Sequence, residues 1–99
     1  MKKLADELEQ RWAAMFTALA AGDDVPPAQR LRTEGMMESA LLLGHASVEA
    51  LDRAMDSCYQ EAFHCGLAEA FGADWRAFYP FPQIPAMGQR APVYPSTKD

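Results

Sequence analysis

A chain of 99 residues with a net charge of −5 at pH 7 has the length of one domain and an acidic surface. Nucleic-acid binders neutralise phosphates with clustered lysine and arginine, and no such cluster occurs here, which disfavours DNA, RNA and an anionic membrane as ligands. No apolar run reaches the roughly eighteen residues of a membrane span. The two cysteines fit the reducing cytoplasm, where we expect the protein.

The first segment predicts an amphipathic helix over residues 3–21. Its apolar side chains recur at spacings of three and four, the period of one helix face. They are Leu4, Leu8, Trp12, Met15 and Leu19, with Phe16 beside them. Gly22 can adopt the left-handed conformation that commonly follows a helix. Pro26 and Pro27 favour extended geometry in the residues before them, so the segment between the two helices is not expected to be helical.

A second helix is predicted over residues 27–43, and its pattern is apolar on two sides. One face is marked by Thr33, Met36, Met37, Ala40, Leu43 and Gly44. Leu31, Gly35 and Leu42 fall roughly opposite. A helix that is apolar on two sides is usually covered on two sides. Because this short chain has few helices with which to cover both, we expect another molecule to supply the second cover, and therefore a homodimer.

A third helix is predicted over residues 48–71, with a wide apolar face. Its two apolar rows are Val48, Leu51, Met55, Cys58, Ala62 and Cys65, and Tyr59, Phe63, Gly66, Ala70 and Phe71. Gly44 can end the second helix and Ser47 can cap the third, so we favour a break between them. The alternative is one long helix over residues 27–71, because the apolar spacing keeps its phase through the junction, and such a helix would make an extended dimer.

A proline-rich tail follows the helices. Asp74 can cap a short turn, and the residues after it hold most of the prolines, which favour extended segments. Large apolar side chains in this tail lead us to expect at least residues 79–87 to lie across a helical surface of this chain or of a partner. We therefore expect an all-α fold, a helical hairpin or three-helix bundle over residues 1–79, with an extended tail over residues 80–99, in a dimer.

Four residues could carry metal or redox chemistry: Cys58, Glu61, His64 and Cys65. Glu61 and His64 form a Glu-x-x-His element, and two such elements on facing helices can build a di-metal site. Only one copy is present, and on an intact helix the two cysteines lie about 10 Å apart, too far for a disulfide. Buried apolar cysteines and a solvated histidine are the more ordinary interpretation. A metal-binding or redox protein remains the alternative, and we expect no bound cofactor or metal.

Other functional motifs are weak or missing in the sequence. We find no nucleophile elbow, phosphate-binding loop or plausible Ser-His-Asp order, so we do not expect an enzyme. The helix–turn–helix around Gly44 invites comparison with DNA-reading motifs, but its second helix begins with three acids and one arginine, a balance that repels phosphate. Two PxxP patterns, at residues 82–85 and 92–95, match polyproline ligands but arise often by chance in such tails.

The sequence therefore favours a small acidic protein that works by binding another protein. We expect a regulator that modulates or sequesters its partner, for which a transcription factor is one candidate, because an acidic surface steers towards basic partners. Small bacterial regulators such as anti-activators share this size and acidity, an analogy at the level of the fold alone. The residues predicted to contact the partner or a second copy are Leu31, Met36, Leu42, Met55, Tyr59, Phe63 and Phe81.

Overall fold

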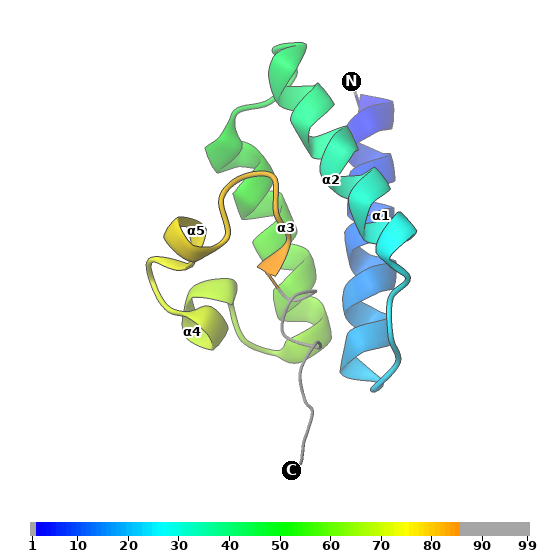
Figure 1. The fold of residues 1–99 in the computed structure, drawn as a ribbon, viewed down its shortest axis with the longest axis vertical. Coiled ribbons are helices and arrows are strands. Elements are labelled where there is room, and N and C mark those ends of the chain that lie inside the picture. Colours follow the sequence, from blue (N-terminus) through cyan, green and yellow to red (C-terminus); the bar gives the residue numbers. More distant parts are fainter. Residues whose placement is uncertain (1, 86–99) are drawn as a thin grey trace.

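The computed structural model describes residues 2–85, which contain five named helices (Figure 1). They are α1 (Lys2–Ala20), α2 (Pro27–Leu42), α3 (Val48–Phe63), α4 (Leu67–Phe71) and α5 (Trp75–Phe78). The long helix α1 packs against both α3 and α2, whereas α4 and α5 lie on the side of α3 away from α1. The described residues contain no strand, which confirms the predicted all-α class.

The first two helices follow the sequence pattern closely. α1 begins and ends one residue before its predicted bounds, and Gly22 has a φ of +90°, the left-handed conformation expected after a helix. Pro27 occupies the first turn of α2, where its missing N–H costs nothing. The apolar pattern and the positions of glycine and proline therefore set these two helices.

The chain breaks between α2 and α3, as Gly44 and Ser47 predict. Gly44 has a φ of +74°, and the Ser47 Oγ accepts a hydrogen bond from the Ala50 N–H at 3.1 Å. The alternative of one helix over residues 27–71 is therefore wrong. α3 instead runs back alongside α1 and forms the most extensive helix pair of the described chain.

The predicted third helix is too long, because α3 ends at Phe63 and not at Phe71. His64 adopts a left-handed φ of +65°, and α4 begins at Leu67. Asp56 supplies the physical reason: its Oδ1 accepts the Leu67 N–H at 2.7 Å, one of the free donors at the start of α4. A carboxylate on α3 thus stabilises the first turn of α4. The spacing of apolar residues in the sequence cannot predict such a contact.

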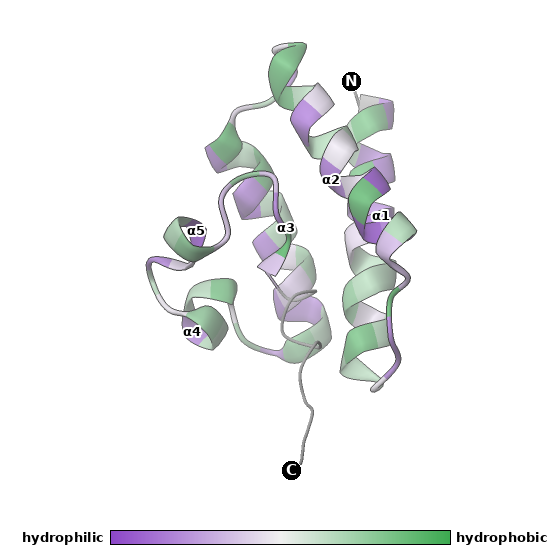
Figure 2. Cartoon of the chain, viewed as in Figure 1, coloured by the Kyte–Doolittle hydropathy of each residue, from purple (hydrophilic) through white to green (hydrophobic). Residues whose placement is uncertain are grey.

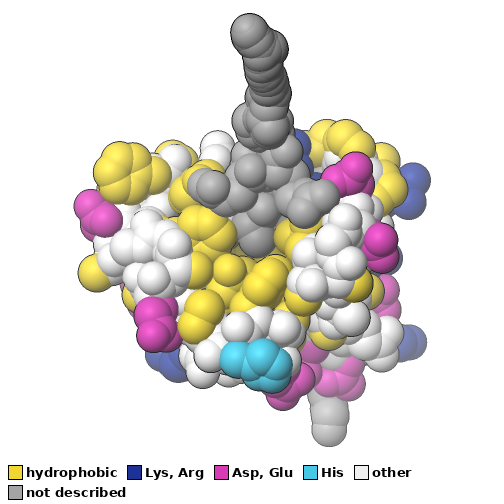
Figure 3. Space-filling model, turned by 90° about the horizontal axis from the view of Figure 1, so that it is seen from below, with side chains coloured by type: hydrophobic (Ala, Val, Ile, Leu, Met, Phe, Trp, Pro, Cys, Tyr) yellow, Lys and Arg dark blue, Asp and Glu magenta, His cyan; other side chains and the backbone are white. Residues whose placement is uncertain are grey.

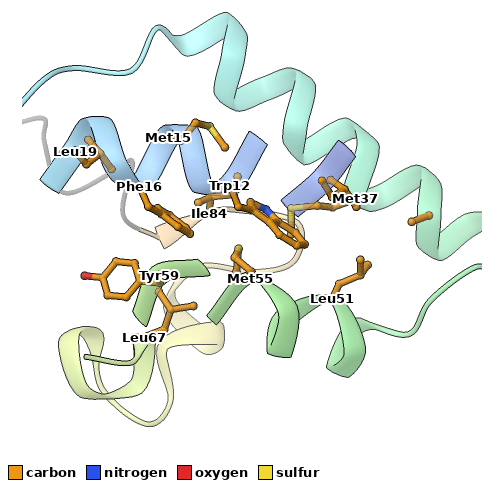
Figure 4. Close-up of a cluster of buried hydrophobic side chains, with 12 residues drawn as sticks. Trp12, Met15, Phe16, Leu19, Met37, Leu51, Met55, Tyr59, Leu67 and Ile84 are labelled. Carbon is orange, nitrogen blue, oxygen red and sulfur yellow. The ribbon is translucent and has the colours of Figure 1, made fainter. Parts of the chain in front are cut away.

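The core lies between α1 and α3 (Figure 4). Trp12 and Phe16 of α1 meet Met55 and Tyr59 of α3, all at most 5% exposed, and the rings of Phe16 and Tyr59 pack edge-on with centroids 5.2 Å apart. Met37 adds the inner face of α2 to the same cluster. Burial of large side chains, each contributing about 1.5–3 kcal/mol, makes this cluster the main source of stability.

Residues 79–85, called the strap below, cross the bundle, and residues 79–84 of the strap are not helical. Ile84 is 2% exposed and joins the core cluster, and Pro85 is also buried. The expectation that this part of the tail lies across a helical surface is confirmed for residues 79–85. Residues 86–99, with Met87 and the second PxxP pattern, lie outside the described part of the chain.

Two charged side chains hold the strap in place. Arg76 of α5 donates to both oxygens of Asp52 on α3, at 2.7 and 3.1 Å, and also to the backbone carbonyls of Tyr79 and Gln83. On the other side, the buried Glu34 of α2 accepts the Ile84 N–H at 3.0 Å. The strap is therefore fixed by directional hydrogen bonds to charged groups, which are stronger than neutral ones.

Candidate functional site

The side of α2 that faces away from α1 carries uncovered apolar residues. At 100° per residue, its centre lies opposite the buried Thr33, Met37 and Ala40. We call this surface the outer face of α2 and define it by Ala28, Leu31, Gly35 and Leu42. Leu31 is 57% exposed and Leu42 is 77% exposed, and a Cβ built on Gly35 would meet no atom within 4 Å. The two-sided pattern of α2 therefore corresponds to one covered and one uncovered side.

A second uncovered surface lies where α2 ends. Leu43 is 67% exposed and Leu41 is 36% exposed, and this end of the helix is strongly apolar in Figure 2. Beside it is a hollow of about 190 Å³, which we call the loop-end hollow. Its walls are Leu4, Ala5, Leu8, Ala40, His45, Ala46 and Leu51, drawn from α1, α2, the connecting loop and α3. A hollow of this size accommodates one apolar side chain or a benzene-sized group.

Small side chains create the loop-end hollow. Ala5, Ala40 and Ala46 stand where larger residues would fill the space between the three helices. An adjoining apolar hollow of about 170 Å³ shares Ala5 and Ala46 and extends along α1 and α3. Sequence reasoning missed this site, because a pattern of apolar residues shows which faces meet but not how completely they fill the space between them.

The seven residues predicted to contact a partner fall into three groups. Leu31 and Leu42 are exposed on the outer face of α2. Met55 and Tyr59 belong to the chain's own core, so their surfaces are already covered. The remaining three are half-buried and pack against the core: Met36, Phe63 and Phe81. The structure therefore brings the exposed members together on α2 and gives the others mainly structural contacts.

Contacts to their aromatic rings accompany the burial of two of these half-buried residues. The Phe63 ring stacks on the Tyr59 ring with centroids 4.4 Å apart. The centroid of the Phe81 ring lies 5.1 Å from the guanidinium carbon of Arg76, and the same carbon lies 4.6 Å from the centroid of the Trp75 ring. Such cation–π contacts hold the strap and α5 together. The sequence analysis did not predict a role for Arg76. The available signal was its position among several aromatic residues, with which an arginine can form cation–π contacts.

The four residues of the metal or redox alternative do not converge. Cys65 lies beyond the end of α3, so it does not share a helix face with Cys58, and both are free thiols. Glu61 and His64 are exposed. Among residues 2–85, no three histidine, cysteine, aspartate or glutamate side chains are grouped so that they could hold a metal ion.

Cys58 has a distinct environment between α1 and α3. Its Sγ lies 3.8 Å from the Glu9 carbonyl oxygen, and burial, with the nearby Glu9 and Glu61 carboxylates, raises its pKa from 9.0 to about 11. The thiolate is the nucleophilic and metal-binding form of cysteine. This environment therefore keeps Cys58 a protonated thiol at neutral pH, of low reactivity.

The opposite end of the bundle shows a further group of apolar side chains (Figure 3). Half-buried Phe63 and exposed His64 lie at this end of α3, and acidic side chains lie around the rim in this view. The exposed leucines of α2 and the loop-end hollow are the surfaces considered below for function.

Comparison of the chain with protein-family models, curated proteins and solved structures gave no match. Within residues 2–85, none of the helices combines the length and apolar character needed to cross a membrane.

Proposed function

We propose that this chain is a small regulatory interaction module that binds another protein at the loop end of the bundle. The observation that carries the proposal is that exposed Leu43 and the loop-end hollow lie at the same end of the bundle. A partner that docks at this end can cover the leucine and place an apolar side chain in the hollow. Buried anchors in pockets of this kind dominate the energy of many protein interfaces.

The size of the uncovered apolar surface supports binding to a protein. Full burial of one leucine side chain contributes about 1.5–3 kcal/mol, and Leu41 and Leu43 are both available at this end. An apolar side chain from a partner helix could occupy the hollow, while its neighbours cover the leucines. Single exposed apolar side chains are ordinary on protein surfaces, but an exposed leucine and an apolar hollow at the same end of the bundle support an interaction site there.

Charge supports a basic partner. The chain has a net charge of −5, and Glu38 and Glu49 are exposed near the two sides of the loop in the sequence. Complementary charge at the edge of an interface speeds association and selects partners. A transcription factor, whose DNA-binding surface is basic, fits this requirement, and binding there would sequester it from DNA.

The test is recovery of a partner by the full chain and by two matched variants. In Leu43→Asp, a charge replaces the exposed leucine at the loop end, and in Phe78→Asp, the same change is made at a 70% exposed residue on α5. Cell extract is passed over each immobilised protein, and bound proteins are identified by mass spectrometry. We expect a basic protein that binds wild type and Phe78→Asp and is lost with Leu43→Asp.

Circular dichroism of both variants checks that each remains folded, since both positions are exposed. The partner is then purified and its affinity for each variant is measured by titration calorimetry, with an expected loss of about tenfold or more for Leu43→Asp. Equal affinity of wild type and Leu43→Asp would place binding elsewhere and contradict the proposal.

A further inference from the structure

Three hollows follow one another along the contact between α1 and α3. The first is the loop-end hollow, and the second is the adjoining hollow of about 170 Å³, which we call the middle hollow. The third has a volume of about 460 Å³, and we call it the acidic hollow. The first two share Ala5 and Leu8, and the last two share Glu9 and Ala54. The three hollows therefore form one continuous groove, called the seam groove below.

Small side chains keep the seam groove open. Beyond the loop end, its walls come from α1, α3 and the loop before α3, and no described residue of α2, α4, α5 or the strap lines it. Ala50, Ala54 and Cys58 line the α3 side at intervals of about one turn. Along α1 the groove extends from the level of Ala5 to that of Ala13, a distance of about 12 Å.

The two ends of the seam groove differ in charge. The loop-end and middle hollows are mainly apolar, whereas Asp6, Glu9 and Glu61 line the acidic hollow and no described lysine or arginine does so. These three carboxylates are exposed, and none has an ion pair with another described residue. After burial, Glu9 and Glu61 are the causes that raise the pKa of Cys58, so both carboxylates act on the same wall of the groove. Such unpaired carboxylates attract a cationic group.

We propose that the seam groove binds an amphipathic helix of the partner protein, with large apolar side chains in the loop-end and middle hollows and lysine or arginine at the acidic hollow. This inference rests on the proposed function, because it names the element of the partner that docks at the loop end. Helices that bind in grooves place their anchoring side chains at spacings of three, four and seven residues.

The spacing of the hollows favours a helix over an extended segment. Neighbouring side chains on one face of a helix lie about 5–6 Å apart, so three successive turns match three hollows spread over about 12 Å. The walls of the groove are helices, whose backbone groups are already paired, and an extended segment would therefore find no backbone partner there. A helix pairs its own backbone groups and needs only side-chain contacts.

The acidic hollow determines the charge of the partner helix. Lysine and arginine have long apolar stems, which can lie along Ala13 and Ala54 while the charged end reaches the carboxylates. Nucleic acids and anionic membranes carry the wrong sign of charge for this end of the groove. The net charge of −5 favours a basic partner in general, and the acidic hollow assigns that preference to three named side chains.

Selection from a library of helical peptides tests the proposal with a defined probe. The peptides have about eighteen residues and a helix-forming framework, and the residues on one face are varied. Peptides that bind the immobilised full chain are enriched, and their affinities are measured by fluorescence anisotropy at low and high salt. We expect large apolar residues one turn apart, followed by lysine or arginine, and weaker binding at high salt. Enrichment of no peptide, or of peptides without this order, would overturn the proposal.

Two matched pairs of variants locate the binding. Glu9→Lys reverses a charge in the seam groove, and Asp23→Lys makes the same change at an exposed residue after α1. Ala5→Leu fills the loop-end and middle hollows, and Ala14→Leu adds the same side chain on the opposite side of α1. We expect Glu9→Lys and Ala5→Leu to bind the enriched peptides about tenfold or more weakly, with both controls unchanged. Circular dichroism checks the fold of each variant, and equal affinities within either pair would overturn the proposal.

Partner recovery from cell extract separates this inference from the proposed function. Glu9 does not line the loop-end hollow, whereas Leu43 is exposed at the loop end. A partner that is lost with Leu43→Asp but binds Glu9→Lys as tightly as wild type would overturn the seam groove and leave the proposed function standing. Peptides that meet the expectations above, together with a partner whose binding Leu43→Asp does not change, would support the seam groove and contradict the loop end as the site.

Discussion

The strap and the outer face of α2 show opposite relations between sequence pattern and burial. The strap is irregular and rich in proline, yet Ile84 within it is 2% exposed. The outer face of α2 belongs to a regular helix, yet Leu42 on it is 77% exposed. Both segments carry large apolar side chains, so apolar content alone does not decide which of them is covered.

Polar anchors make the difference. In the strap, Arg76 donates to two backbone carbonyls and Glu34 accepts the Ile84 N–H, so these groups stay paired when the strap packs on the bundle. The outer face of α2 has its backbone already satisfied within the helix but no third element on which to pack. The strap is therefore buried because hydrogen bonds fix it against the bundle, whereas no described segment is fixed over the outer face of α2.

Replacement of Ile84 by alanine and of Leu42 by alanine compares the two regions directly. Ile84→Ala should lower the free energy of unfolding by about 2–5 kcal/mol, because a buried side chain is lost and a cavity remains. Leu42→Ala should change it by about 0.5 kcal/mol or less, because the leucine is exposed. Chemical denaturation at low protein concentration measures both. Equal effects would show that the strap does not belong to the core.

Removal of the Arg76 side chain tests the first anchor. Arg76→Ala should lower the free energy of unfolding by about 2–4 kcal/mol, because Asp52 and two backbone carbonyls lose their donor. Arg53→Ala, an exposed arginine on α3, is the control and should have little effect. Thermal unfolding followed by circular dichroism makes the comparison. Arg76→Lys should recover only part of the loss, since lysine cannot match the fork on Asp52.

Glu34 tests the second anchor. Glu34→Ala should cost about 1–3 kcal/mol, since the buried Ile84 N–H loses its acceptor. Glu34→Gln keeps an acceptor oxygen and should be milder, and Glu38→Ala, one turn further along α2, should have almost no effect. Hydrogen exchange at the Ile84 amide gives a local measurement. If Glu34→Ala leaves that amide as protected as in wild type, Glu34 does not hold the strap.

Apolar periodicity was sufficient to predict α1, α2 and the start of α3. Gly22, Gly44 and Ser47 correctly marked where the first two helices end and where the third begins, because each acts through its own backbone or nearest neighbours. These are local effects, and local effects are readable from a single sequence. The exposed side of α2 was also readable, because Leu31 and Leu42 lie opposite the core face.

Long-range polar contacts could not be read in the same way. Asp56 caps α4, Arg76 binds Asp52, and Glu34 binds the strap, and each joins residues on different elements. No spacing in the sequence records such pairs. They explain why α3 ends early and how the strap is fixed. The loop-end hollow was missed for a related reason, since it depends on how three helices fit together.

The smallest predicted effect on stability concerns Cys58. This residue lies outside both compared regions, at the contact between α1 and α3. Its folded-state pKa, raised to about 11, exceeds its ordinary value of 9.0, so the folded protein holds the thiol proton more tightly than the unfolded chain does. The resulting stabilisation is fully present below pH 9 and is lost as the pH rises towards 11.

Wild type should therefore lose stability more steeply than Cys58→Ala across this alkaline range, measured as the melting temperature at successive pH values. Burial also raises the pKa of Tyr59, and Cys65 adds to that shift, so part of the alkaline decline should remain in the variant. Ser57→Ala, at the exposed neighbouring position, should follow the wild-type curve. If Cys58→Ala declines as steeply as wild type, the thiol is not desolvated between α1 and α3, and that contact is looser than the core beside it.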